Sequence, residues 1–373
     1  MTRVLSVVDL FSGSGGMSTG FHRDGRFEVV GAVDIERGKP SSGDGSTNCN
    51  ETYKANIGIA PMAEDLSAVD PLKLLSAFDL KIGDLGVLIS CAPCTGFSQK
   101  NANNLVNDDP RNRLVQRSAE FVRHFMPEYF VMENVKELIK GKHQHHFRSL
   151  VRSLTDLGYK IKAEVHDLTD FGLPQRRIRA MLVAKREGHA PFPEPSRSGV
   201  RTVRDAISHL PPLRAGETHP EDDMHACPSM TEVPLKRLMS IPQDGGSWTD
   251  IPDSLAHLRI PSMNKKKPGS FPDIYGRLWW DRPAPTITRE CSSPGNGRYC
   301  HPEQDRLLSV REMSLLQGFP ADYVFKGSLA SRYRHIGDAV PPLVSEQIAS
   351  VIGDDANGQF QAQTVMRDLL EAI

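Results

Sequence analysis

The sequence has no long hydrophobic run, few cysteines and no excess of charge of either sign. None of its 373 residues fall in an apolar stretch of eighteen, and its start runs directly into a strand pattern, so we expect neither a membrane span nor an export signal. Six scattered cysteines are too few for a disulfide framework, which favours a reducing cytoplasm. A net charge of −1 gives no global case for a polyanionic partner.

The chain does have enough apolar content for a large core, with 39% hydrophobic residues. Strand and helix patterns alternate up to about residue 187 and return near residue 304. Between them prolines, glycines and histidines are common and the alternation is lost. We therefore expect an α/β fold: a doubly wound, Rossmann-like sheet over residues 1–187 and 304–373, with a smaller loop-rich domain over residues 188–303.

The first strand pattern ends in clustered glycines. Val4 to Phe11 is apolar and runs into Ser12-Gly13-Ser14-Gly15-Gly16-Met17, which is typical of either a cofactor loop or a tight turn. A second strand, Phe27 to Val33, ends in Asp34, where an acid can bind ribose hydroxyls. Asp65 is expected at a third strand end. Acids at these places favour an adenosine ligand without phosphates.

A third apolar run, Val87 to Ile89, leads into a stiff turn that carries Cys94. Pro93 fixes the backbone before this cysteine, so Cys94 is either a nucleophile or a small buried residue. Cys91 and Cys94 also form a C-x-x-C pair, which leaves a thiol–disulfide oxidoreductase as an alternative. The polar stretch Gln99 to Asn107 is expected to be a mobile loop.

Charged residues follow two later strand patterns. Tyr129 to Met132 ends in Glu133, at the sheet edge expected for Cys94. Arg177 and Arg179 share one face of an extended segment, where they can orient a carboxylate or a carbonyl oxygen, or form a surface charge ladder.

Two further clusters are more ambiguous. His143-Gln144-His145-His146 has no carboxylate or cysteine at suitable spacing, so we expect a solvated helix start and no metal site. The lysines 265–267, with nearby Tyr275, Trp279 and Trp280, suit a nucleic-acid groove or a solvated loop.

In this order, the segments resemble the motifs of the DNA cytosine C5-methyltransferase family of bacterial or phage type. The resemblance rests on Asp9 to Gly16, Pro93-Cys94, Glu133 to Val135, Gln175 to Arg179, Arg306 to Pro320 and Gly337 to Pro342. The chain departs from the family in four places: Ser90-Cys91-Ala92 replaces Gly-Gly-Pro, Thr95 replaces Gln, Asp338 replaces Asn, and residues 38–48 are an insertion. Losing an amide at position 338 is expected to weaken cofactor binding.

The resemblance implies a mostly parallel sheet with one antiparallel strand and a target-recognition domain at residues 188–303. It implies that Cys94 attacks C6 of a flipped-out cytosine, Glu133 binds N3 and the exocyclic amine, Arg179 holds O2 and Arg177 positions Glu133. It further implies S-adenosyl-L-methionine as cofactor, with S-adenosyl-L-homocysteine as product. The implied cofactor residues are Phe11, Ser12, Gly13, Ser14, Gly15, Gly16, Met17, Asp34, Ile35, Asp65, Leu66, Pro93, Leu114, Asp338, Ala339 and Val340.

The implied partner is double-stranded DNA, read in the major groove by the small domain of a cytoplasmic monomer. A cognate restriction endonuclease is a candidate partner in the same cell. A tRNA methyltransferase and an inactive DNA-binding relative remain as alternatives within the family; the 2′-hydroxyl preference would reveal the former.

Overall fold

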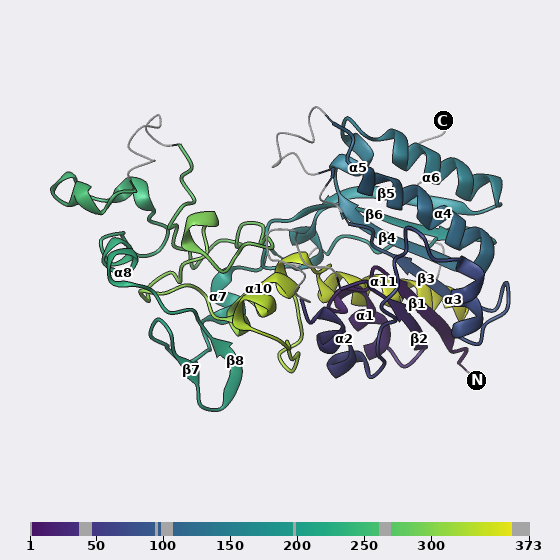
Figure 1. Ribbon diagram of the computed structural model, residues 1–373, viewed down its shortest axis with the longest axis horizontal. Helices are drawn as coiled ribbons and strands as arrows, with labels where there is room; N and C mark the ends of the chain where they lie inside the picture. The colour runs from purple at the N-terminus through teal and green to yellow at the C-terminus, as the bar shows by residue number, and fades with distance from the viewer. Residues whose placement is uncertain are drawn as a thin grey trace.

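A six-stranded sheet forms the core of one part of the molecule (Figure 1). The computed structural model describes residues 2–36, 47–93, 96–97, 107–196, 199–260 and 270–359. The strands are β1 (Leu5–Leu10), β2 (Phe27–Val33), β3 (Val87–Ser90), β4 (Tyr129–Val135), β5 (Lys160–Asp167) and β6 (Ile178–Lys185), in the spatial order β2-β1-β3-β4-β6-β5.

The sheet is mostly parallel, as expected. β1 pairs in parallel with β2 and β3, and β3 pairs in parallel with β4, whereas β6 runs antiparallel to both β4 and β5. The chain leaves β1 towards β2 and later returns to β3 on the other side of β1. This reversal makes the carboxyl end of β1 a topological switch point, the place where open α/β sheets bind ligands.

Helices cover both faces of the sheet. Side chains alternate along the strands, so Val7 and Ile89 join one hydrophobic cluster and Val8 and Leu88 join another. The first face is covered by α1 (Gly16–Arg23), α2 (Cys49–Ile57) and α11 (Pro342–Ala356). The second is covered by α3 (Pro71–Ala77), α4 (Arg113–Phe125), α5 (Glu137–Lys140) and α6 (His145–Asp156).

A loop-rich region lies beside the sheet, on the left of Figure 1. It contains α7 (Val203–Ile207), α8 (Glu232–Met239) and the two-stranded sheet of β7 (Thr218–His219) and β8 (Asp222–Ala226). α9 (Val310–Leu316) and α10 (Leu329–Asp338) follow it. Their buried side chains belong to the same hydrophobic cluster as those of α7 and α8, a cluster that spans residues 203–339. The division into domains at residues 187/188 and 303/304 stays a prediction.

The strand expected before Asp65 is absent, because only an isolated parallel bridge joins Met62 to Val33. Pro61 has no N–H to extend the ladder, and Glu64 N donates to Met62 O, which turns the chain away from the sheet. None of the helices in the described ranges is long and apolar enough to cross a membrane.

Candidate active site at the carboxyl edge of the sheet

The glycine loop between β1 and α1 requires glycine where it meets α11. Gly15 caps α1 with a φ of 91°, in the left-handed region. At Gly16 a Cβ atom would lie 2.2 Å from the carbonyl oxygen of Val340. The structure thus brings together two residues that were expected from distant motifs, Gly16 and Val340. Neighbouring Ser12 has a buried Oγ with no hydrogen-bond partner among the described residues.

Asp34 ties this loop to the end of β2. Its Oδ2 accepts from Gly13 N at 2.9 Å and its Oδ1 accepts from Glu36 N at 2.7 Å. Burial raises the pKa of Asp34, although these two backbone hydrogen bonds act in the opposite direction. A carboxylate can accept about four hydrogen bonds, so Asp34 keeps capacity for a ligand hydroxyl.

The other predicted cofactor residues differ in exposure. Asp65 accepts from the backbone N–H and the hydroxyl of Ser67, while Leu66 is buried in the core. Ile35 is 37% exposed. Ser14 donates from its Oγ to His335 O at 3.2 Å and Met17 is buried, whereas Phe11, Pro93 and Leu114 are half-buried.

Glu133 and Arg179 meet at the carboxyl edge of β4. Because β6 is antiparallel, its first residues lie beside the last residues of β4, with Val135 opposite Arg179. Arg179 Nε lies 2.9 Å from Glu133 Oε1, and both side chains are largely buried. Glu133 Oε1 has no aligned hydrogen-bond partner within the described parts of the chain, so this ion pair leaves hydrogen-bonding capacity at the carboxylate.

The segment that leads to Cys94 is tied to the same edge. Cys91 Sγ accepts from Glu133 N at 3.4 Å, and Asn134 Nδ2 donates to Ala92 O at 3.0 Å. Burial and the nearby Glu133 charge raise the pKa of Cys91 well above its usual range, so this cysteine stays a thiol. Cys94 and Thr95 lie outside the described residues, as do residues 99–106 of the expected loop, residues 38–46 of the insertion and lysines 265–267.

Arg177 is the residue just before β6, and its guanidinium reaches two backbone carbonyls. Its Nη1 donates to Ile287 O at 3.0 Å and its Nη2 donates to Ala339 O at 3.1 Å. Arg179 is the arginine that forms an ion pair with Glu133. The expectation that Arg177 positions Glu133 stays a prediction.

Two glutamines to which the sequence analysis gave no role also hold the backbone at Ala339, the residue that Arg177 contacts. Gln175 Nε2 donates to Gln317 Oε1 at 2.6 Å, and Gln317 Nε2 donates to Ala339 O at 2.9 Å. Both glutamines are fully buried. Gln175 stands in the Gln175–Arg179 motif and Gln317 in the segment Arg306 to Pro320, so their motif positions were the available signal. Together they hold the backbone at Ala339, next to Val340.

Asp338 ends α10 and carries a charge where an amide was expected. Its Oδ2 lies 3.4 Å from Arg289 Nη1, and half of its side chain is exposed. The carboxylate is thus partly balanced by an arginine from the loop-rich region.

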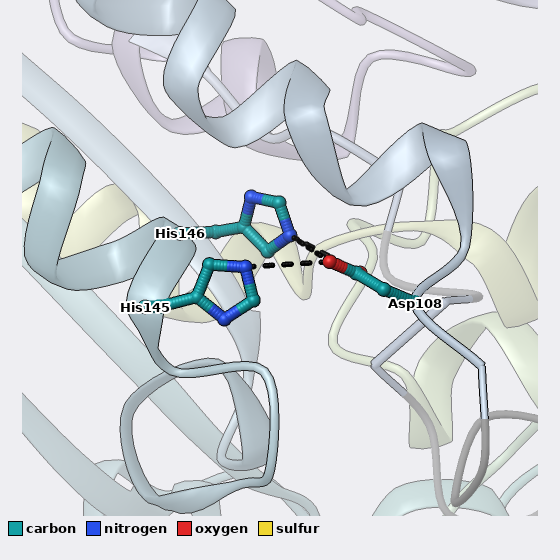
Figure 2. A group of neighbouring side chains, drawn as sticks. All are labelled: Asp108, His145 and His146. Atoms are coloured by element: carbon teal, nitrogen blue, oxygen red, sulfur yellow. Dashed lines mark hydrogen bonds and ion pairs between the residues drawn. The ribbon is translucent and has the colours of Figure 1, made fainter.

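The histidine run at the start of α6 has a carboxylate neighbour after all. Asp108 lies within ion-pair distance of His143, and also of His145 and His146, both of which are drawn with it in Figure 2. Asp108 precedes these histidines by more than thirty residues, so local spacing could not reveal it. The sequence expectation considered only carboxylates at suitable spacing, and the structure adds one that is close in space.

Comparisons with known proteins agree with this arrangement. A family model of C-5 cytosine-specific DNA methylases matches residues 5–354. The Type II methylase M.HgiDII of Herpetosiphon aurantiacus is 34% identical over 368 residues, covering 96% of this chain and 98% of that protein. The Type II methyltransferase M1.HphI of Haemophilus parahaemolyticus is also 34% identical, over 93% of this chain and 86% of that protein.

Solved structures share the fold. A prophage-encoded protein of E. coli, described as a DNA modification methyltransferase, superimposes with a TM-score of 0.68 at 21% identity, covering 95% of this chain and 99% of that one.

Proposed function

Because this chain belongs to the C-5 cytosine-specific DNA methylase family and is a DNA (cytosine-5-)-methyltransferase, we propose that it methylates C5 of a flipped-out cytosine through a covalent Cys94 adduct. The observation that carries this proposal is the pair of Glu133 and Arg179 at the carboxyl edge of β4. This pair lies beside the segment that leads to Cys94, and Glu133 keeps an oxygen with hydrogen-bonding capacity.

We propose S-adenosyl-L-methionine as the methyl donor, with S-adenosyl-L-homocysteine as product. When bound, it supplies an electrophilic methyl group. Its fit is supported by the buried Oγ of Ser12, which has no hydrogen-bond partner in the described ranges, by the loop at Gly16 that has no room for a side chain, and by the remaining acceptor capacity of Asp34. Phe11 and Ile35 would contact the adenine, and Asp65 would accept from its amino group.

The proposed chemistry starts at C6 of the cytosine ring. The Cys94 thiolate adds to C6, which moves electron density to C5 and makes C5 the nucleophile. Glu133 donates a proton to N3 as the adduct forms, and Arg179 donates to O2 while holding the glutamate in place. After methylation, a water molecule accepts the C5 proton, the C6–S bond breaks with departure of the Cys94 thiolate, and N3 returns its proton to Glu133, which restores the aromatic ring.

The target base has to leave the duplex, because ring atom C6 is otherwise stacked between its neighbours; flipping costs about a few kcal/mol. We propose that residues 188–303 read the DNA sequence in the major groove, and that the enzyme acts as a cytoplasmic monomer. The Type II names of its relatives support a restriction–modification role with a cognate endonuclease.

The test is mechanism-based trapping on DNA with 5-fluorocytosine at the target position. Fluorine cannot leave C5 as a proton does, so an adduct through Cys94 should persist as an SDS-stable protein–DNA complex in the presence of the methyl donor. Bisulfite sequencing of DNA from cells that express the protein supplies the target sequence beforehand.

Matched variants separate the roles of the residues. Cys94→Ser should give no complex and no methylation while still binding DNA, whereas Cys91→Ser should remain active under reducing and mildly oxidising conditions. Glu133→Gln should lower kcat by about 10²–10⁴-fold. A Cys94→Ser enzyme with a tenth of normal activity would overturn the nucleophile assignment, and equal losses in both cysteine variants would favour a redox pair.

A further inference from the structure

Three histidines converge on one carboxylate that the proposed catalytic chemistry does not use. His146 Nε2 lies 2.9 Å from Asp108 Oδ2 and 3.1 Å from Oδ1, and His145 Nε2 lies 3.3 Å from Oδ2 (Figure 2). His143 Nδ1 lies 3.6 Å from Oδ1. The potential ligand atoms of Asp108, His145 and His146 all lie within 4.8 Å of one another.

The two neighbouring histidines project in the same direction, which residues adjacent on a regular helix do not normally do. They stand at the first turn of α6, and their rings are 4.1 Å apart, with 36° between the ring planes. Figure 2 shows both rings extending from the start of the helix towards Asp108. The helix start therefore presents two imidazole nitrogens to a single point.

The carboxylate is held from the opposite side. Asn112 is fully buried and donates from Nδ2 to Asp108 Oδ1 at 2.7 Å. Asn112 immediately precedes α4, and α4 packs on α6 through a shared hydrophobic cluster that includes Phe121 and Leu154. Core packing of α4 on α6 thus holds Asp108 and the histidines near one another, so they are already gathered before a ligand binds.

The exposure of the cluster differs from one member to the next. His146 is 3% exposed, and its ring packs edge-on against Phe97 with 5.9 Å between centroids. The side chains of His145 and Asp108 are 57% and 40% exposed. The side of the cluster formed by His146 is therefore buried. The side formed by His145 and Asp108 is open to solvent, so an ion can enter from there.

We propose that Asp108, His145 and His146 bind one late first-row divalent transition metal ion, with zinc as the ion expected in the cell. A tetrahedral zinc ion with bonds of about 2.0–2.1 Å separates its ligand atoms by about 3.3 Å, which matches the distance from His145 Nε2 to Asp108 Oδ2. His146 Nε2, now 2.9 Å from Asp108 Oδ2, would move back by a few tenths of an ångström, and the two imidazole nitrogens, which lie within 4.8 Å of each other, would close on the ion. Water occupies the fourth position on the exposed side.

The donor set decides the class of ion. Two imidazoles and one carboxylate suit zinc, cobalt and nickel, whereas magnesium and calcium prefer oxygen ligands alone. The ion joins the chain just before α4 to the start of α6, so its binding stabilises the folded state.

The experiment uses the full chain without a histidine tag, stripped with a chelator and dialysed. Cobalt titration followed by visible ligand-field absorption, and zinc titration by calorimetry, should both show one ion per chain. Zinc at about 100 times its dissociation constant should raise Tm by a few degrees. Magnesium under the same conditions should produce no shift.

His145→Ala is the cleanest variant, because this exposed side chain contributes little to packing. His145→Ala and Asp108→Asn should each weaken binding at least tenfold and abolish the cobalt spectrum. The control His124→Ala, at a half-buried histidine in the last turn of α4, should bind as the parent does. Calorimetry that detects no stoichiometric zinc binding by the parent, or equal binding by the His145→Ala and Asp108→Asn variants, would overturn the proposal. Because these readouts do not involve methylation, their failure leaves the proposed function intact.

Discussion

Replacing Asp9 by asparagine should stabilise the protein at neutral and alkaline pH. Asp9 lies in β1 beneath the glycine loop, is 1% exposed, and accepts from Ser18 Oγ at 2.5 Å. Burial, with a smaller contribution from the charge of Asp34, raises the pKa of Asp9 to about 7, although the Ser18 hydrogen bond lowers it. Between pH 3.8 and about 7, Asp9 therefore keeps its proton in the folded protein, whereas the unfolded chain has already released it.

The magnitude follows from linkage. The pKa of Asp9 rises from its ordinary 3.8 to about 7 on folding. At about 1.36 kcal/mol per pKa unit, the free energy of unfolding loses ~4 kcal/mol from this group. This ~4 kcal/mol of the free energy of unfolding is fully present below pH 3.8 and is lost as the pH rises through 7. The reason is that, between these two values, the native state binds more protons than the unfolded chain. Asparagine keeps an oxygen for Ser18 Oγ and does not titrate.

The assay is urea unfolding of the cofactor-free protein, followed by far-UV circular dichroism between pH 5 and 8.5. The difference in unfolding free energy between Asp9→Asn and the parent should grow with pH and approach a plateau above pH 7. His301 and His335, whose pKa values burial lowers to about 4, also make stability depend on pH, but they are present in both proteins and cancel in the difference.

Asp322→Asn is the control, because this carboxylate is 73% exposed in its pair with Arg23 and should show no such trend. The reasoning is refuted if the difference between Asp9→Asn and the parent does not change with pH, or if Asp322→Asn shows the same change.

Three further substitutions test contacts that hold the site together. Glu312→Gln should lower the free energy of unfolding by about 3–5 kcal/mol in urea titrations, because Arg306 and Glu312 are both 1% exposed and the arginine would lose its counter-charge. Gly16→Ala should cost about 1–3 kcal/mol by overpacking against the chain that enters α11, whereas Gly25→Ala, which faces open space, should change stability by less than about 0.5 kcal/mol. Arg177→Met should remove donors from two buried carbonyls at about 1–3 kcal/mol each, which thermal unfolding would detect, and Arg177→Lys should recover part of the loss.

Much of the sheet could be predicted from the sequence, because its strands are short apolar runs bounded by turn residues. Phe27–Val33 was predicted to the residue, and the strand expected over Tyr129 to Met132 continues for three more residues to Val135. The family resemblance also implied the single antiparallel strand. These features depend on local composition and on the order of motifs, and both can be read directly from the amino-acid sequence.

The missed contacts depend on which distant residues meet. Arg177 and Arg179 are two residues apart, and only the register of β6 against β4 shows that Arg179 is the one beside Glu133. Asp108 meets the histidines of α6 because α4 and α6 pack side by side, and no spacing rule contains that information. Met62 forms a single bridge because its neighbours prevent a longer ladder.

The hydrophobic cluster that spans residues 203–339 has a consequence for how such enzymes can acquire new sequence specificity. Arg311 in α9 donates to Asp222 in β8, and Tyr333 in α10 donates to Leu308 O within the same interior. A graft of residues 188–303 from a relative would cut through this interior and separate surfaces that were selected together. An exchange of residues 188–339, which ends beyond α10, would instead keep this interior in one piece.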